Sequence, residues 1–230
     1  MGILRIISRS PEPFTDREEA GLLLGKELTA YSGRNTVVLG IPRGGVVVAW
    51  RAACILGSEM DVVLSRKLGA PGNPEFAIGA ISEDGKLFLG EAIRERMGDY
   101  QDLLGYVERE REKQYAEIAK RIARYRDVRP KVPLKGKVVI VTDDGIATGA
   151  TMQASLWSAR REEPEKLIAA APVASLDAME RIADDADEAI ALKVPPYFQA
   201  VGQFYTSFGQ TTDEEVISIL RESVERGTCG

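Results

Sequence analysis

Short apolar runs rich in β-branched residues recur along this chain and limit its fold more than any other feature. The runs are TVVLGI from residue 36, DVVLSRKL from residue 61, KVVIVTDD from residue 137 and KLIAAAPV from residue 166. Runs that are apolar almost throughout, separated by helical segments, are typical of a parallel sheet that helices cover on both faces. We therefore predict an α/β fold, with an open and mainly parallel sheet flanked by helices.

The segments beside these runs carry helical patterns. Asp16 can cap a helix that continues to about Tyr31, and a terminal helix is expected to begin near Thr212. VVVAWRAACIL follows the first strand and MQASLWSARR follows the third, each with the length and apolar content of a helix packed on a sheet.

Residues 69–133 interrupt this alternation and are predicted to form an insertion in a single domain over residues 1–230. GAPGNPEFAIGA has the glycine and proline content of a flexible loop, and ISEDGKLFL, with its Asp-Gly pair, predicts a hairpin. A long charged helix is expected from about residue 100 to 125. Because its charges are mixed in sign, we interpret it as a solvated face over an apolar stripe.

Composition and charge exclude several classes of function. The 230 residues are 44% hydrophobic and 28% charged, as in ordinary globular proteins. A formal net charge of -5 provides no overall basic field, so nucleic acid is not an expected partner. The chain has no histidine, which excludes histidine-based catalytic triads and the usual zinc sites. Its chemistry must use carboxylates, Lys, Arg, hydroxyls and the backbone.

Cysteine usage and the N-terminus bear on the compartment. Cys54 and Cys229 are too few for a disulfide framework, which fits a reducing cytosol. MGILRIISRSPEPF lacks the pattern of a signal peptide, and no run of 18 or more apolar residues is present. We expect a cytoplasmic protein without a membrane partner.

The stretch VVIVTDDGIATGAT, residues 138–151, places two acids where a buried strand ends. In open parallel sheets, ligands bind beyond the carboxyl ends of the strands, where Asp143 and Asp144 fall. The small residues of the turn from Ala147 to Thr151 let backbone amides face a ligand, with a helix start behind them, which suits a phosphate. A phosphate beside two carboxylates predicts a ligand that also carries hydroxyls or Mg²⁺, such as a sugar phosphate.

Other motifs with similar parts do not fit. A Walker loop needs a lysine after Gly149, and PRGGVV does not supply the glycine spacing of a dinucleotide-binding fingerprint. The phosphatase pattern Asp-x-Asp-Gly-Thr also fails, because the two acids are adjacent. The pair could merely cap a strand and a helix, but the whole stretch favours a ligand site.

Three segments together resemble a known family. VVIVTDDGIATGAT is similar to the phosphoribosyl diphosphate (PRPP) binding motif of type I phosphoribosyltransferases, with four apolar residues, two acids and a Thr-Gly loop. GIPRGGVVVA, SRKLGAPGNPEFAIGAI and TDDGIATGAT, in this order, resemble a bacterial group of predicted phosphoribosyltransferases of unknown acceptor. The resemblance covers about residues 12–222. It implies the type I phosphoribosyltransferase fold and, by itself, a homodimer.

The resemblance also assigns roles to residues. It gives Asp143 and Asp144 the ribose hydroxyls, directly or through Mg²⁺ and water, and gives the turn at 147–151 the 5-phosphate. Arg43 to Gly45 match the pyrophosphate loop, and Arg66 and Lys67 match cations that precede a flexible loop. The expected catalytic residues are Asp143, Asp144, Arg43 and Lys67. The expected PRPP contacts are Gly44, Gly45, Arg66, Ala147, Thr148, Gly149, Ala150 and Thr151.

The chemistry of PRPP explains these residue types. Breaking its anomeric bond expels pyrophosphate and builds oxocarbenium-like charge on the ribose. Mg²⁺, the expected cofactor, would offset charge on the departing diphosphate together with Arg43 and Lys67. Water must be excluded, so a closing loop is expected, with GAPGNPEFAIGA as its candidate.

The acceptor is less well defined. The superfamily often has a bulky residue at the place of Gly145 and a glycine at that of Ala150. The 6-oxopurine enzymes carry an acid where Ala147 stands, which argues against hypoxanthine or guanine. The acceptor should lie under a hood formed by residues 12–32 and 194–230. Candidates for stacking on a planar base are Tyr197, Phe198, Phe204, Tyr205 and Phe208, although such aromatics are more often packed in a core.

Two classes of function fit these features. The first is a phosphoribosyltransferase that acts on a nucleobase or another small nitrogenous acceptor. The second is a PRPP-sensing regulator without turnover, because a fold does not fix a function. The presence of Arg43, Arg66 and Lys67 favours the enzyme. A nucleic-acid regulator would need RYRDVRPKVPLKGK as a basic face that binds RNA with steep salt dependence.

Overall fold

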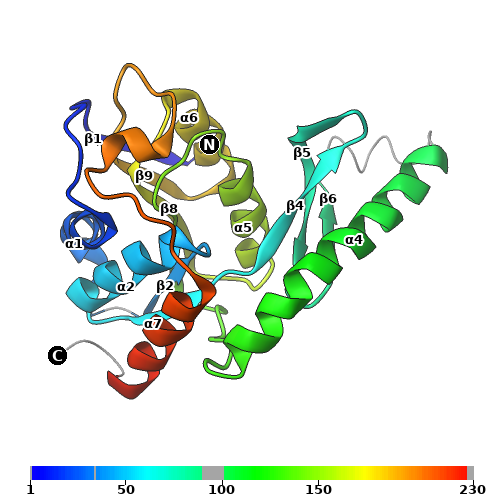
Figure 1. Ribbon diagram of the computed structural model, residues 1–230, viewed down its shortest axis with the longest axis horizontal. Helices are drawn as coiled ribbons and strands as arrows, with labels where there is room; N and C mark the ends of the chain where they lie inside the picture. Colours follow the sequence, from blue (N-terminus) through cyan, green and yellow to red (C-terminus); the bar gives the residue numbers. More distant parts are fainter. Residues whose placement is uncertain (1, 34, 90–100, 227–230) are drawn as a thin grey trace.

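The structure is a computed structural model that describes residues 2–33, 35–89 and 101–226 (Figure 1). Within these residues, a six-stranded sheet has the order β1-β9-β8-β7-β2-β3, and every neighbouring pair is parallel. Its strands are β1 (Ile3–Ser8), β2 (Thr36–Gly40), β3 (Glu59–Val62), β7 (Val138–Thr142), β8 (Lys166–Val173) and β9 (Glu188–Lys193). The predicted α/β fold is confirmed.

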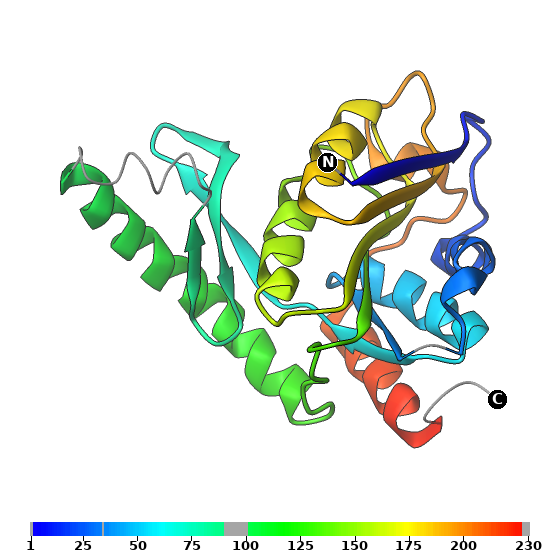
Figure 2. The same ribbon diagram turned by 180° about the vertical axis from the view of Figure 1, so that it is seen from behind.

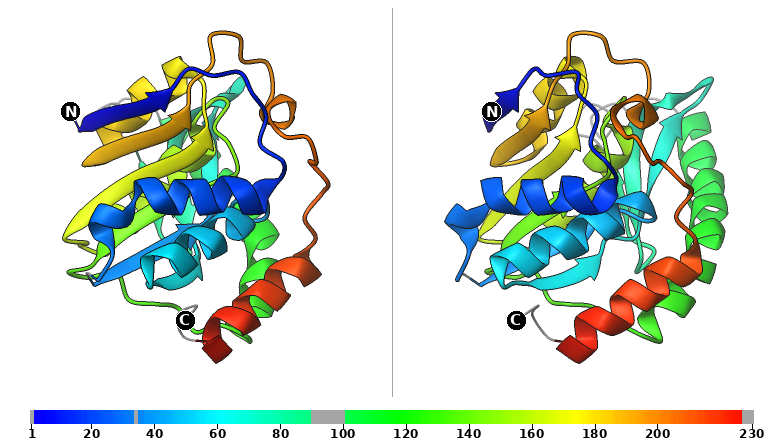
Figure 3. Two further views of the ribbon diagram at one scale, coloured as in Figure 1. Left: turned by 90° about the vertical axis from the view of Figure 1, so that its left-hand side faces the viewer. Right: turned by 60° about the vertical axis from the view of Figure 1, so that its left-hand side comes forward.

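Helices cover both faces of this sheet, because alternate residues of each strand point to opposite sides. Val38 and Ile140 face one core and their neighbours Val37 and Val139 face the other. The first core is closed by α1 (Arg17–Glu27), α2 (Gly44–Leu56) and α7 (Asp213–Arg226), of which α1 and α2 lie side by side in Figure 3. The second is closed by α5 (Ala150–Arg160) and α6 (Leu176–Asp185).

The helix ends follow the predicted chemistry. Asp16 caps α1 by accepting a hydrogen bond from the Glu19 amide at 2.9 Å, and the helix ends at Glu27, before a 3-10 turn, η1 (Thr29–Tyr31). Thr212 and Glu215 form a reciprocal capping box at the start of α7, with bonds of 3.1 and 2.6 Å. The elements β1, α6 and β9 were not predicted from the sequence.

The insertion is a second, smaller layer beside α5, as Figure 2 shows. It contains an antiparallel sheet of β4 (Ser65–Ala70), β5 (Asn73–Ser82) and β6 (Leu87–Leu89), crossed by α4 (Gln101–Arg126). Leu68, Ile81 and Val107 form part of a small core between this sheet and α4. The long helix and the hairpin between β5 and β6 are as predicted. Residues 90–100 lie outside the described residues.

Two sequence-based expectations about this region are wrong. DVVLSRKL is not one strand: it divides after Val62 into β3 of the parallel sheet and β4 of the antiparallel one. GAPGNPEFAIGA is not a loop, because it forms most of a hairpin in which β4 pairs with β5. Gly72, with φ of +76°, supplies the left-handed backbone of the turn, so the Gly and Pro content marked a turn rather than a loop.

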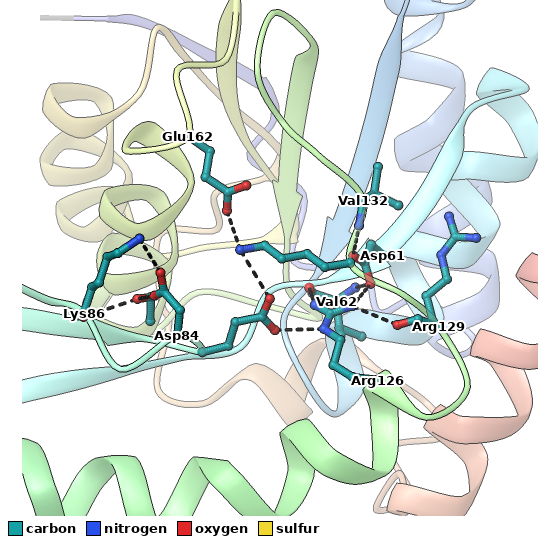
Figure 4. Close-up of polar contacts among 11 residues, drawn as sticks. Asp61, Val62, Asp84, Lys86, Arg126, Arg129, Val132 and Glu162 are labelled. Atoms are coloured by element: carbon teal, nitrogen blue, oxygen red, sulfur yellow. Dashed lines mark hydrogen bonds and ion pairs between the residues drawn. The ribbon is translucent and has the colours of Figure 1, made fainter.

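A buried network of charges fixes the end of α4 to the parallel sheet (Figure 4). Arg126 donates to Asp61 of β3 at 2.7 Å and to Glu83 of the β5–β6 turn at 2.9 Å. Lys131 continues the network to Glu83 at 3.3 Å and to Glu162 at 2.8 Å. The Asp61 side chain is only 2% exposed. The position of α4 relative to the main sheet is therefore set by specific ion pairs.

Two further observations bear on the expected compartment. In the part of the chain that the structure describes, no helix is both long and apolar enough to cross a membrane. Cys54, on α2, is disulfide-bonded. The cysteine count did not predict this bond.

Candidate functional site

The two acids lie at the carboxyl edge of the sheet, directly after its strand β7. β7 is an inner strand, with β2 on one side and β8 on the other. Asp143 is half-buried and accepts a hydrogen bond from the Asp144 amide at 2.8 Å. The acids therefore sit where the loops after neighbouring strands converge.

The glycine turn after β2 packs against these acids. A Cβ on Gly44 would collide with Asp144 Oδ2, so the side chain of Asp144 would have to move. A Cβ on Gly45 would lie 2.7 Å from Asp143 Cα, and this backbone leaves room only for glycine. The preceding peptide bond, Pro42–Arg43, is cis. The two motifs, about a hundred residues apart in the sequence, thus form one contiguous surface.

Arg43 stands at the start of α2, half-buried, and its charge acts on α4. Burial and the hydrogen bond to Asp213 raise the pKa of Tyr125 on α4, and the positive charge of Arg43 is among the effects that oppose this rise. Arg43 therefore directly precedes the glycines that contact the acids, and its positive charge acts to lower the pKa of Tyr125 on α4.

The turn at 147–151 presents its backbone to the same edge. Two of its carbonyls accept hydrogen bonds from α6 and its N-cap residue. Ala147 O accepts from Oγ of the N-cap Ser175 at 2.7 Å, and Thr148 O accepts from Nη2 of Arg181 on α6 at 3.1 Å. Gly149, with φ of +80°, precedes α5 and has no side chain with which to cap it. Because the first amides of a helix have no partner within the helix, this end can bind an anion.

Arg66 and Lys67 border a cavity of about 560 Å³ that opens beside this edge. Both lie on β4 rather than at the end of a parallel strand. Pro42 of the glycine turn and Thr151 of α5 line the same cavity, so three of the predicted segments meet there. One face of α4 forms the opposite wall, a role that the sequence did not predict.

Sequence reasoning also missed Arg17, on α1, which binds one of the two acids. Its Nε donates to Asp144 Oδ2 at 2.7 Å and its Nη1 donates to the carbonyl of Gly209 at 2.7 Å. Its guanidinium lies 4.0 Å from the centre of the Phe208 ring. The side chains of Arg17 and Asp144 are only 12% and 16% exposed. No signal in the sequence pairs residues that lie 127 positions apart.

The two hood segments meet above the acids. Phe14 and Tyr205 form an isolated bridge, and the Tyr205 hydroxyl donates to the carbonyl of Asp144 at 2.5 Å. Phe204 is buried and packs on Phe198, which is the core role that such aromatics usually have. Tyr197 and Phe208 are exposed, at 83% and 38%. Tyr197 has surface free for a ligand, whereas the Phe208 ring contacts the Arg17 guanidinium and stacks on Tyr205 with 5.0 Å between the ring centres. A contact of either residue with an acceptor remains a prediction.

The electrostatics of the acid pair disfavour a full negative charge on both carboxylates. Burial raises the pKa of Asp143 well above its ordinary value, and the neighbouring charge of Asp144 raises it further. The Asp144 amide and Arg17 act in the opposite direction and do not offset the rise. The described residues contain no cluster of three or more potential metal ligands. The pair would hold a metal ion only together with oxygens from water or a ligand.

The fold and this edge together define a class of protein, namely a parallel α/β domain with a candidate ligand site at the carboxyl edge of its sheet. The site contains two carboxylates, a glycine turn, the start of a helix and nearby cations. Such a set suits a phosphorylated, hydroxyl-bearing molecule. Gly44 and Gly45 pack against the two acids. Arg66, Lys67 and Thr151 line one cavity together with Pro42. The contacts of all these residues with PRPP remain predictions.

Comparisons with known proteins identify the family. The Phosphoribosyl transferase domain model matches residues 18–203. Two Mycobacterium tuberculosis proteins, from strains CDC 1551 and H37Rv and both named "Putative phosphoribosyl transferase", are 43% identical over 207 residues, or 90% of this chain. The crystal structure of TT1426 from Thermus thermophilus is 50% identical with a TM-score of 0.85, covering 91% of this chain and 98% of that one. The chain belongs to the phosphoribosyl transferase domain family.

The matches cover most of this chain but less than half of each mycobacterial protein. The match covers 46% of each mycobacterial protein, so this chain spans about half the length of the curated relatives. The family resemblance found in the sequence is confirmed.

Proposed function

We propose that this protein transfers the 5-phosphoribosyl group of PRPP to a nucleobase or another small nitrogenous acceptor and releases pyrophosphate. The observation that carries the proposal is the direct packing of Gly44 and Gly45 against Asp143 and Asp144. This packing brings the segment that we propose as the pyrophosphate loop next to the two acids that we propose to bind the ribose hydroxyls. Membership of the phosphoribosyl transferase family supports the same reading.

Each part of the edge has a distinct task in this proposal. The carboxylates of Asp143 and Asp144 accept hydrogen bonds from the ribose hydroxyls. The amides at the start of α5 and the Thr148 hydroxyl hold the 5-phosphate. Arg43, Arg66 and Lys67 face the diphosphate, where positive charge stabilises the leaving group as the anomeric C–O bond breaks. The acceptor nitrogen then forms the new bond to that carbon.

The acid pair fits Mg²⁺, which we propose as the cofactor. Mg²⁺ prefers oxygen ligands and is commonly bound by one or two carboxylates together with substrate phosphates and water. The adjacent carboxylates of Asp143 and Asp144 provide oxygen ligands of this kind. The bound ion would neutralise charge on the diphosphate.

The acceptor is proposed to lie beneath the hood, on the side of Tyr197 and Phe208. Phe208 already carries the guanidinium of Arg17 on its ring, so the hood contacts Asp144 through Arg17. Ala147 stands where the 6-oxopurine enzymes carry an acid. This difference favours acceptors other than hypoxanthine and guanine.

The decisive experiment is an acceptor screen. The protein is incubated with Mg²⁺, PRPP and a panel of nucleobases and small amines, and pyrophosphate release is measured. We expect release that depends on one acceptor class. Saturable PRPP binding without release for any acceptor would favour the alternative, a PRPP-sensing regulator.

Replacing a single hydroxyl tests the assignment of the 5-phosphate. Thr148→Val keeps the volume of an exposed side chain and removes its donor, so PRPP affinity should fall severalfold. Binding is measured by calorimetric titration. Unchanged affinity would contradict the placement of the phosphate at the turn.

A further inference from the structure

The cavity beside the candidate site has a second wall, which comes from α4. Lys113, Gln114, Glu117 and Arg121 line the cavity of about 560 Å³ and are spaced so that they share one face of the helix. Arg66, Lys67 and Thr151 line it from the opposite side. The sequence-based interpretation of α4 as a solvated face over an apolar stripe is therefore incomplete.

The charges on the two walls favour an anion. Glu110 is engaged with its own helix, since it accepts from Gln114 at 2.7 Å and lies 3.9 Å from Lys113. Glu117 reaches Arg66 only at 4.0 Å, and the buried Nε of Arg66 has no hydrogen-bond partner among the described residues. Lys113 is 71% exposed, and its ammonium keeps most of its hydrogen-bonding capacity for a ligand.

The cationic face continues beyond this cavity. A second hollow of about 390 Å³ shares Arg66, Glu117 and Arg121 with the first. It adds two cations and one acid: Lys120, Arg124 and Asp213. Arg121 contacts Asp213 of α7 through Nε at 3.6 Å, a loose pairing that leaves a ligand able to compete. Positive side chains therefore outnumber the acids along the groove.

Hydrogen bonds from both halves of α4 join it to the rest of the molecule. Its N-terminal half is tied to β4 by the Tyr106 hydroxyl, which donates to the Gly69 carbonyl at 2.8 Å. Its C-terminal half is tied by Tyr125 to Asp213 at 2.6 Å and by Arg126 to buried Asp61. The cations on its inner face are thus held at a defined place opposite β4.

We propose that α4 provides half of the diphosphate site, with Lys113 and Arg121 binding the pyrophosphate group opposite Arg66 and Lys67. This inference rests on the proposed function and adds specificity-determining residues to it. A diphosphate carries several negative charges, and cations on two sides offset them more fully than those of β4 alone. Thr151, at the start of α5, also lines this cavity and belongs to the turn where the 5-phosphate is proposed to bind.

The test separates the two ends of PRPP. Calorimetric titrations with Mg·pyrophosphate, with ribose 5-phosphate and with Mg·PRPP are performed on the full chain and on Lys113→Ala and Arg121→Ala. We expect each variant to bind pyrophosphate about tenfold more weakly and ribose 5-phosphate within about twofold of the unsubstituted protein. Arg111→Ala is the matched control, because it removes one positive charge from α4 at a residue paired with Glu108, outside the cavity.

Each outcome decides a different point. If Lys113→Ala and Arg121→Ala bind pyrophosphate as the Arg111→Ala control does, the inference about α4 is wrong and the proposed function stands. An equal loss for pyrophosphate and ribose 5-phosphate also overturns it, since the effect would then be general. If the unsubstituted protein binds neither pyrophosphate nor PRPP, the proposed function itself fails. Lys113 is exposed, so its variant remains informative even if Arg121→Ala loosens α4 from α7.

Discussion

At the scale of single residues, the contact between the two motifs depends on the absence of a side chain at Gly44, because a Cβ there would collide with the carboxylate of Asp144. The acids and glycines could be predicted from the sequence, because each follows a strand and forms part of a local motif. Arg17 could not, since its contact with Asp144 depends on how α1 packs across the sheet. Arg66 and Lys67 were predicted at the site but on the wrong element, because the apolar run before them shows no break.

Gly44→Ala tests the contact between the two motifs. The new Cβ would displace Asp144 Oδ2 or the backbone of the turn, so PRPP affinity should fall at least about tenfold, with a stability loss of about 1–3 kcal/mol. Calorimetric titration and denaturant unfolding measure the two effects. Gly105→Ala on α4 is the control: its Cβ meets only the far end of the Arg109 side chain, and alanine favours a helix. Equal PRPP affinity for both variants would contradict the observed packing.

At the scale of elements, the strands with continuous apolar runs and the helices with good caps were predicted correctly. β1, β9 and α6 were missed because their sequences mix small and charged residues with apolar ones. The division between β3 and β4 has no local signal. It is set by the buried pair Asp61–Arg126, which holds the junction against α4.

Asp61→Ala tests what fixes α4 to the sheet. The substitution leaves the guanidinium of Arg126 without its buried partner, so stability should fall by about 3–5 kcal/mol. Denaturant unfolding measures the loss. The matched control is Lys135→Ala, which breaks an exposed pair with Glu163 and should change stability by less than about 1 kcal/mol. Similar losses in both variants would show that the buried network does not hold α4.

At the scale of the whole molecule, the order of the parallel strands explains why distant motifs meet. β2 and β7 are neighbours, so the turns that follow them lie at one edge. Far from this edge, Glu188 of β9 joins several elements: it accepts from Tyr31, from Lys166 of β8 at 2.9 Å and from Arg5 of β1 at 3.1 Å. This cluster links the outer strands to α1 through the turn η1.

Glu188 also makes stability depend on pH. Burial raises its pKa, but the hydrogen bonds from Tyr31, Lys166 and Arg5 outweigh burial and hold the pKa below its ordinary value of 4.5. The carboxylate therefore stabilises the fold above pH 4.5, and this contribution is lost as the pH falls through the folded-state pKa. Glu188→Gln should lower stability by about 1–3 kcal/mol at pH 7 and flatten the dependence between about pH 5 and 3.

Unfolding curves across this pH range provide the check. The exposed acid Glu180 of α6 supplies a control, Glu180→Gln, which should keep the slope of the unsubstituted protein. If Glu188→Gln retains the full acid dependence, the cluster does not carry it.

A calorimetric titration of Mg·PRPP into the protein and into Asp144→Asn tests most directly whether the acids after β7 bind PRPP. We expect saturable binding by the unsubstituted protein and binding at least about a hundredfold weaker in the variant, because a neutral amide attracts neither the ribose hydroxyls nor a cation as the carboxylate does. Asp127→Asn, at an exposed aspartate after α4, should bind PRPP normally. If the unsubstituted protein does not bind PRPP, or if Asp144→Asn binds it equally well, PRPP does not bind at the site that contains Asp144.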